Sequence, residues 1–198
     1  MRNYDQPLLP DHYYHIFNRA VGSEKLFNLD KNYHFFLQRF RQYILPIADI
    51  FCYALLPNHF HFFLRMKSLP SLEAHYLQLK KKPFKANAAE EIQDFAMEQF
   101  SNWCNSYTKS FNRSNGRMGK LFMEKLNRNT ICSQSYYSAI VFYIHNNPVK
   151  HNIRTHMIDW PFSSYNLIVA DTPCWLQKDE LLEWFGGMEG FLRFHQQP

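Results

Sequence analysis

The sequence predicts an α+β protein in which helices pack on an antiparallel sheet. An aromatic and β-branched stretch over residues 13–21 is typical of a strand, and two apolar runs within residues 50–64, separated by a turn at Pro57 and Asn58, are typical of a hairpin. Between these strands, apolar side chains recur at helical spacing over residues 33–44. The order strand, helix, strand, strand favours a sheet that a helix covers on one face while the other face stays open.

The helices are predicted from their spacing and their end signals. Asp30 is a suitable N-cap for the first helix, and Pro46 ends its pattern. Residues 66–112 are predicted to be mostly helical, and the apolar stripe from Ile92 to Phe111 indicates a long amphipathic helix. A stripe of this kind is typical of a helix that packs on the core.

A further helix is predicted to begin at Ser133 or Ser135, either of which can cap it, and to end at Pro148. One continuous face of this helix carries Tyr136, Ile140, Tyr143 and Asn147. In isolation, Tyr143 and Asn147 are compatible with a core aromatic residue and an ordinary helix end. A carboxamide oxygen is also a competent ligand for a hard divalent ion, and a phenol one turn away could reach a substrate of that ion.

Length and composition set the domain organisation and the compartment that we expect. With 198 residues, of which 46% are apolar and 18% aromatic, the chain can bury one substantial core, so we expect a single domain with a terminal appendage. The four cysteines are far apart in the sequence, which favours free, buried thiols in a reducing compartment. The N-terminus lacks the apolar core of a signal peptide, and no apolar run is long enough to cross a membrane. We therefore expect a cytoplasmic protein without a membrane partner.

His59 and His61 are the first candidate functional residues. Side chains at positions i and i+2 of a strand share a face, so the two imidazoles project together while Phe60 and Phe62 project to the opposite face. Two neutral imidazoles can form half of a divalent-metal site, although a His-x-His pair on an apolar strand is also compatible with a structural role. A metal site would need a third ligand from elsewhere in the chain.

Basic side chains gather between residues 108 and 130, around Gly116 and Gly119, in a chain whose formal net charge is +5. They are Lys109, Arg113, Arg117, Lys120, Lys125 and Arg128. Such a run is either a solvated loop or, with Phe111 and Phe122 beside it, a surface that binds a phosphate backbone and stacks bases. The residue pattern alone leaves both interpretations open.

Several segments of the sequence, taken together, are similar to a known family. They are Leu56-Pro57-Asn58-His59-Phe60-His61, Tyr143-Ile144-His145-Asn146-Asn147-Pro148-Val149-Lys150, and residues 14–19, 111–122 and 160–165. In this order they resemble the IS200/IS605-type transposases of the HUH single-tyrosine nuclease superfamily, and within it the branch related to the repetitive-element-associated tyrosine transposases. The resemblance covers residues 12–170, so it implies one domain over residues 1–170, followed by a helical tail over residues 171–198.

The resemblance implies a ferredoxin-like α+β core whose sheet carries the two histidines, with the tyrosine on a nearby helix. It also implies an enzyme that binds single-stranded or hairpin DNA, cuts one phosphodiester through a 5′-phosphotyrosine intermediate, and rejoins strands when a 3′-OH attacks that bond. Tyr143 would be the nucleophile, and His59 and His61 would hold Mg²⁺ or Mn²⁺. Asn147 stands where the transposon enzymes have a glutamine as third ligand, and its side chain is one methylene shorter. His145, two residues after Tyr143, is expected to point away from the site.

The basic residues would, by the same resemblance, bind the DNA backbone. Those between residues 109 and 128 would be joined by Lys150, His151 and Arg154 after the tyrosine helix, and by Arg19 near the sheet. Two rival interpretations stay open: a DNA-binding protein of the same fold that does not cleave, and a metal-dependent phosphodiesterase that uses water. A covalent protein–DNA adduct would distinguish them from the transposase, and the sequence leaves open whether the chain forms a homodimer.

Overall fold

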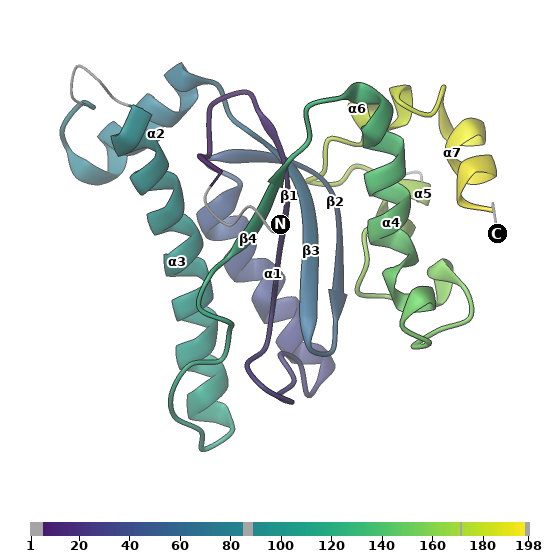
Figure 1. Cartoon of the computed structure of the whole chain (residues 1–198), viewed down its shortest axis with the longest axis horizontal. Coiled ribbons are helices and arrows are strands. Elements are labelled where there is room, and N and C mark those ends of the chain that lie inside the picture. The colour runs from purple at the N-terminus through teal and green to yellow at the C-terminus, as the bar shows by residue number, and fades with distance from the viewer. Residues whose placement is uncertain (1–5, 85–88, 171, 197–198) are drawn as a thin grey trace.

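In the described part of the chain, four strands form one antiparallel sheet (Figure 1). They are β1 (Tyr13–Arg19), β2 (Ala48–Leu56), β3 (His59–Met66) and β4 (Asn127–Thr130), and their order in the sheet is β2-β3-β1-β4. With helices in the connections β1 to β2 and β3 to β4, this order is that of a ferredoxin-like fold. The predicted α+β class is thereby confirmed.

The coordinates are a computed structural model that describes residues 6–84, 89–170 and 172–196. Residues 1–5 and 85–88 of the predicted domain, and residues 171 and 197–198 of the predicted tail, lie outside the described residues. Within the described ranges, no helix combines the length and the apolar character that crossing a membrane requires. The four cysteines are free, as the sequence predicted, but the prediction that they are buried holds only for Cys52, and Cys132 is exposed.

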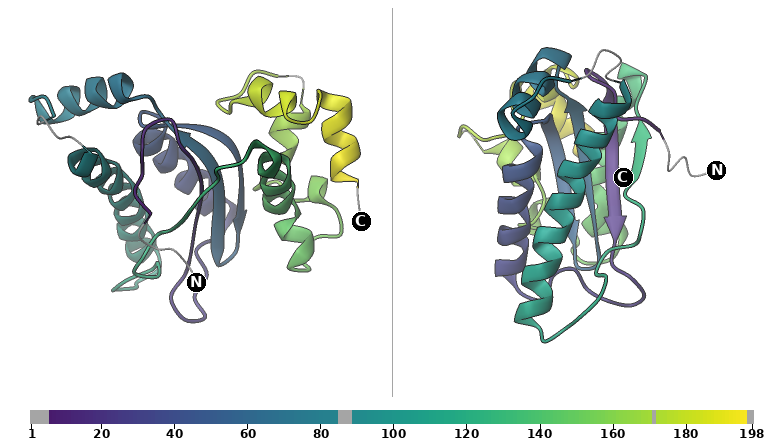
Figure 2. Two further views of the ribbon diagram at one scale, coloured as in Figure 1. Left: turned by 45° about the horizontal axis from the view of Figure 1, so that its top comes forward. Right: turned by 90° about the vertical axis from the view of Figure 1, so that its left-hand side faces the viewer.

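One face of the sheet is covered by α1 (Asp30–Ile44) and α3 (Ala89–Ser114), which lie side by side in the two views of Figure 2. The ring of Phe62 stacks on Phe40 of α1 at a centroid distance of 3.9 Å, and Trp103 of α3 lies 5.1 Å from Phe60. Phe60 and Phe62 therefore face this core, as the strand alternation predicted. The short helix α2 (Leu69–Lys80) connects β3 to α3.

The opposite face of the sheet carries α4 (Tyr137–Lys150), which contacts β2 and β3. After α4 the chain returns to β2, where the N–H of Leu55 donates to Phe162 O at 2.9 Å and the N–H of Ser164 donates to Tyr53 O at the same distance. The remaining helical segments are the 3₁₀ turns Gln134–Tyr136 and Met157–Asp159, and the helices α5 (Tyr165–Val169), α6 (Lys178–Glu183) and α7 (Met188–His195).

The predicted tail packs on the rest of the chain through apolar and polar contacts. The ring of Trp184 lies 4.6 Å from that of Phe51 in β2, measured between ring centroids. Glu180 of α6 accepts a hydrogen bond from Arg65 of β3 at 2.8 Å. In α7, the Nε2 atom of His195 lies 3.0 Å from Nδ1 of His145 in α4. The division of the chain at residue 170 stays a prediction.

Three of the predicted helix ends are wrong. Leu29, rather than Asp30, is the N-cap of α1, and the side chain of Asn32 accepts the N–H of Leu29 at 2.9 Å. Asp30 still lies in the first turn, where a carboxylate favours the helix dipole. Pro148 lies inside α4, which continues to Lys150, because a proline this close to the C-terminus removes a single hydrogen bond.

The predicted serine cap of α4 is the third case. Ser133 and Ser135 hydrogen-bond to each other at 2.6 Å, a 3₁₀ turn follows, and Tyr136 is the N-cap without a side-chain hydrogen bond. The strand β4 was not predicted at all, because Asn127-Arg128-Asn129-Thr130 lacks apolar alternation and pairs only with β1. Its backbone partners, rather than its own side chains, make it a strand.

The docking of α7 should make stability depend on pH. The Nδ1–H of His195 donates to Phe191 O at 2.9 Å, and burial lowers the pKa of His195 from 6.5 to about 4. The pKa of His195 is lower in the folded state than in the unfolded state, so the fold favours the neutral imidazole. The stability that the neutral His195 contributes is complete above pH 6.5 and is lost as the pH falls toward 4. The loss amounts to up to about 3 kcal/mol.

We expect the free energy of unfolding, measured with urea, to fall across this pH window in the wild type and to fall less in His195→Gln. If the free energy of unfolding falls equally steeply with pH in the two proteins, His195 is not the titrating group.

Candidate functional site

His59 and His61 lie at the start of β3, on the face that α4 partly covers. The pairing of β1 with β3 places Arg19 opposite His59 and Phe17 opposite His61. These side chains line a cavity of about 310 Å³, whose full lining is Phe17, Asn18, Arg19, Asn58, His59, His61, Asn127, Tyr143 and His151. The fold thus brings both predicted histidines, the predicted tyrosine and two of the predicted DNA-binding residues, Arg19 and His151, to a single cavity.

Tyr143 reaches this cavity from α4. Its side chain is 36% exposed, and the edge of its ring contacts the ring of His61 at a centroid distance of 5.6 Å. The ammonium of Lys150 lies 5.1 Å from the centroid of the Tyr143 ring. The phenol is therefore accessible from solvent, next to a histidine and a cation.

His59 presents one nitrogen to the cavity. Its Nδ1 atom lies 2.7 Å from Oδ1 of Asn58, and because a carboxamide oxygen only accepts, Nδ1 carries the proton. The lone pair of the neutral ring is then on Nε2. Burial, together with the charges of His151 and Arg19, lowers the pKa of His59 to about 4, so this neutral form persists at neutral pH.

His61 is neutral for the same main reason, since burial and the neighbouring His15 hold its pKa well below its usual value. Its Nδ1 atom lies 2.9 Å from Nε2 of His15 on β1. His15 is 6% exposed, and burial lowers its pKa to about 3. The sequence did not single out His15, although strand alternation places it on the same face as Phe17 and Arg19.

Asn147 is completely buried, one turn after Tyr143. Its Nδ2 atom donates to the backbone oxygen of Tyr143 at 2.7 Å, and Oδ1 has no hydrogen-bond partner among the described residues. Asn147 does not line the cavity.

The donor types present here, two neutral imidazoles and an unpaired carboxamide oxygen, are types that divalent cations bind. In the described ranges, no group of three side chains of the types His, Cys, Asp and Glu is placed so that it could hold a metal ion, so a third protein ligand would have to be of another type. An unpaired, buried carboxamide oxygen is suited to that role, since burial without a partner is unfavourable. The residues His59, His61 and Asn147 would hold the cation.

His145 lies outside the cavity, as expected from its place on the helix. It is completely buried, and its Nε2 atom lies 2.8 Å from the hydroxyl of Ser164 while Nδ1 faces His195. Burial holds its pKa well below the usual value. Its contacts join α4 to the segment beside β2 and to α7.

The predicted DNA-binding cations fall on two sides of the sheet. Lys150, at the end of α4, is exposed, as is Arg154, whose guanidinium stacks 5.3 Å from the ring centroid of Trp160. Lys109 and Arg113 are exposed on α3, which covers the opposite face from Tyr143. The sequence could not separate these groups, because their separation depends on which face each helix covers.

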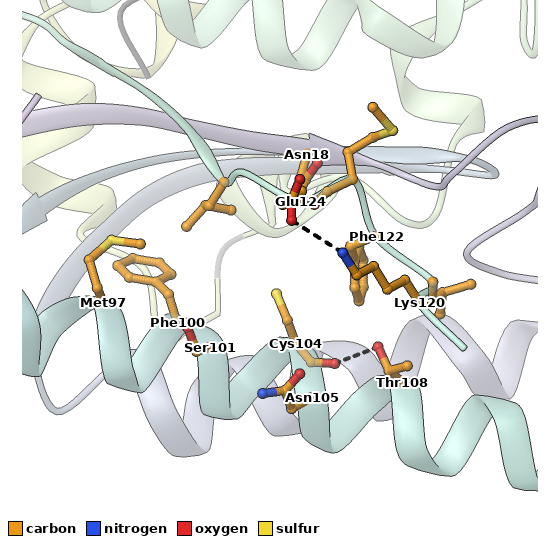
Figure 3. A pocket seen from close by; sticks show the side chains of 13 residues that line it. Asn18, Met97, Phe100, Ser101, Cys104, Asn105, Thr108, Lys120, Phe122 and Glu124 are labelled. Atoms are coloured by element: carbon orange, nitrogen blue, oxygen red, sulfur yellow. Dashed lines mark hydrogen bonds and ion pairs between the residues drawn. The ribbon is translucent and has the colours of Figure 1, made fainter. Parts of the chain in front are cut away.

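Lys120 lies beside a second cavity, of about 280 Å³, between α3 and residues 120–126 (Figure 3). Its ammonium pairs with Glu124 at 3.2 Å. Figure 3 shows Cys104 and Thr108 on α3, across the cavity from Asn18 and Glu124. Lys125 is exposed in the same segment.

Two of the predicted cations have structural contacts. The guanidinium of Arg117 donates to backbone oxygens of its own turn, including Lys120 O at 2.7 Å, and so stabilises the glycine turn. Arg128 is only 7% exposed, and its contact with DNA stays a prediction. It lies on the α3 side of β4, where its side chain donates to Gln6 O and contacts the sulfur of Met97.

Fold and site together define a ferredoxin-like α+β protein with a histidine pair on its sheet and a partly exposed tyrosine on the helix α4 beside them. A search found no matching family model, and no curated protein sequence matches the chain. A solved structure, that of a REP-associated tyrosine transposase bound to a REP hairpin, is similar over 87% of this chain and 89% of its own, with a TM-score of 0.57 and 17% identity. At this identity the likeness shows a shared fold.

The unpaired oxygen of Asn147 allows a test of its role. In Asn147→Leu, which has a similar shape, the loss of the Nδ2 hydrogen bond is offset by removal of an unsatisfied acceptor, so the free energy of unfolding of the metal-free protein should change by about 1 kcal/mol or less. If Oδ1 ligates a cation, the affinity for Mn²⁺ should fall about tenfold or more. Isothermal titration calorimetry measures the affinity, and Asn146→Leu on the next residue is the control. Unchanged affinity in Asn147→Leu would exclude a ligand role.

Proposed function

We propose that the protein is an enzyme of the HUH single-tyrosine type, which cleaves and rejoins single-stranded or hairpin DNA with Tyr143 as nucleophile. The observation that carries this proposal is the position of Tyr143, a partly exposed phenol whose ring contacts His61 at 5.6 Å in a cavity that two neutral histidines line. The shared fold with a transposase bound to a hairpin supports it.

In the cleavage step, the phenol oxygen of Tyr143 attacks the phosphorus of one phosphodiester. A bond from the tyrosine oxygen to phosphorus forms, the bond from phosphorus to the 3′-oxygen breaks, and the leaving oxygen takes a proton to become a 3′-OH. The phenol proton passes to solvent. Attack by a 3′-OH on the 5′-phosphotyrosine reverses these changes, so rejoining needs no external energy source.

The side chains around Tyr143 have roles that match this chemistry. Mg²⁺ or Mn²⁺, when bound by His59, His61 and Asn147, would neutralise charge on the scissile phosphate. Lys150, next to the Tyr143 ring, and Arg19, at the cavity rim, supply positive charge where the phosphate approaches. These two residues and Arg154 would position the DNA backbone.

Substitution of the nucleophile is the first test. We expect the wild type, mixed with a pool of labelled hairpin DNAs and Mn²⁺, to form a slowly migrating protein–DNA band on a denaturing gel, because the adduct is covalent. Tyr143→Phe should lose this band completely, and a chelator should abolish it in the wild type. Tyr136→Phe, which changes an exposed tyrosine just before α4, is the matched control and should retain it.

Two other outcomes of this experiment would contradict the proposal. Cleavage that persists in Tyr143→Phe would show that water is the nucleophile. Binding without cleavage across the whole pool would identify a DNA-binding protein of the same fold.

The two groups of exposed cations give a second test. A double variant, Lys150→Ala with Arg154→Ala, should weaken hairpin binding and reduce the slope of log K against log salt by about 0.7 for each lost contact with a single strand. The double variant Lys109→Ala with Arg113→Ala removes the same charge from the opposite face and should bind as the wild type does. Fluorescence anisotropy over a range of salt concentrations measures both. If the Lys109→Ala, Arg113→Ala variant loses more hairpin affinity than the Lys150→Ala, Arg154→Ala variant, the DNA binds on the α3 face instead.

A further inference from the structure

The contact between His15 and His61 joins two buried side chains across neighbouring strands. Nε2 of His15 and Nδ1 of His61 are 2.9 Å apart, and each residue is 6% exposed. The two rings are 5.1 Å apart and nearly parallel, and His15 also stacks on Phe17 at 4.7 Å. Phe17 packs against the face of the His15 ring, and the Tyr143 ring lies edge-on to His15 at a centroid distance of 5.8 Å. These two contacts and the hydrogen bond to His61 restrict the direction in which Nε2 of His15 points.

A hydrogen bond between these two nitrogens needs one proton between them, and there are two ways to place it when both rings are neutral. If Nδ1 of His61 carries the proton and donates to His15, the lone pair of His61 is on Nε2, which can then ligate a cation. If His15 donates instead, Nε2 of His61 carries the proton and cannot ligate. The tautomer of His15 therefore determines whether Nε2 of His61 can ligate a cation.

His59 also has its Nδ1 atom in a hydrogen bond to another side chain, and its partner there is Asn58, whose carboxamide oxygen can only accept. Nδ1 of His59 donates to the side-chain oxygen of Asn58, which leaves Nε2 of His59 with the lone pair. Both histidines thus have Nδ1 engaged by another side chain of the protein, Asn58 in one case and His15 in the other. Outer partners of this kind orient metal-ligating histidines and increase their basicity.

We propose that His15 is a positioning residue that accepts the Nδ1 proton of His61 and thereby holds His61 in the tautomer that presents Nε2 to a divalent cation. This inference rests on the proposed role of His61 as a metal ligand. It requires that His15 itself carries its proton on Nδ1. His15 does not touch the cation or the DNA.

Substitutions at His15 separate its role as acceptor from its role in packing. His15→Gln keeps a side-chain oxygen that can accept from Nδ1 of His61, whereas His15→Phe keeps an aromatic ring and removes the acceptor. By calorimetry without DNA, we expect His15→Phe to bind Mn²⁺ about 10-fold to 100-fold more weakly than the wild type, and His15→Gln to bind within a few-fold of it. Hairpin binding in the presence of a chelator should be the same in all three proteins, which shows that each is folded.

A spectroscopic measurement tests the tautomers directly. Long-range ¹H–¹⁵N spectra of the Mg²⁺-saturated wild type should show the protons of His15 and His61 on Nδ1. A proton on Nε2 of His61 would overturn the inference, as would Mn²⁺ affinity in His15→Phe equal to that of the wild type. Equal weakening in His15→Gln and His15→Phe would also overturn it, because packing rather than hydrogen bonding would then explain the loss.

Failure of this inference can be distinguished from failure of the proposed function. If the wild type forms the covalent adduct and His15→Phe binds Mn²⁺ normally, the positioning role alone is wrong. If the wild type binds Mn²⁺ in a manner that depends on His15 but forms no adduct with any DNA, the nuclease function is wrong and the positioning role stands.

Discussion

The burial of Phe60 and Phe62 against α1 and α3 is the constraint on which the site depends. These two rings anchor β3 between β2 and β1, and because strand side chains alternate, they also set the direction of His59 and His61. A shift of the strand by one residue would place the imidazoles in the aromatic core and the phenylalanines in the cavity. The apolar core and the polar site thus lie on opposite faces of the same strand. The burial of the two phenylalanines, which stabilises the core, therefore also fixes the orientation of the two histidines.

The position of Tyr143 depends on a second set of contacts, which hold α4 against the sheet. His145 is the centre of this set, since its two nitrogens face Ser164 beside β2 and His195 in α7. The His195 proton lies on Nδ1, toward Phe191 O, so Nε2 of His195 accepts from His145 and the remaining nitrogen of His145 accepts from the Ser164 hydroxyl. A helix held from both sides in this way can present a tyrosine in a defined orientation, and the C-terminal segment contributes to that orientation.

The distribution of charge shows how one stretch of sequence serves different purposes. Residues 108–130 look like a single basic cluster in the sequence, yet Arg117 stabilises a turn, Arg128 is buried on the α3 side of the sheet, and Lys109 is exposed on α3. The cation from the first third of the chain, Arg19, lies instead at the cavity. Proximity in sequence was therefore a poor guide to a common surface, because strand alternation and helix faces send neighbouring residues in different directions.

Local periodicity was sufficient for the α+β class, the hairpin, the first helix and the shared face of His59 and His61, because a strand or helix repeat is set by residues close together in the chain. The resemblance added the ferredoxin-like order of the strands and the choice of Tyr143. The strand β4, the burial of Arg128 and the contact of His15 with His61 could not be predicted, since each depends on the register between segments distant in the sequence. The unpaired oxygen of Asn147 belongs with these, because burial is a property of packing and no spacing of residues along one helix encodes it.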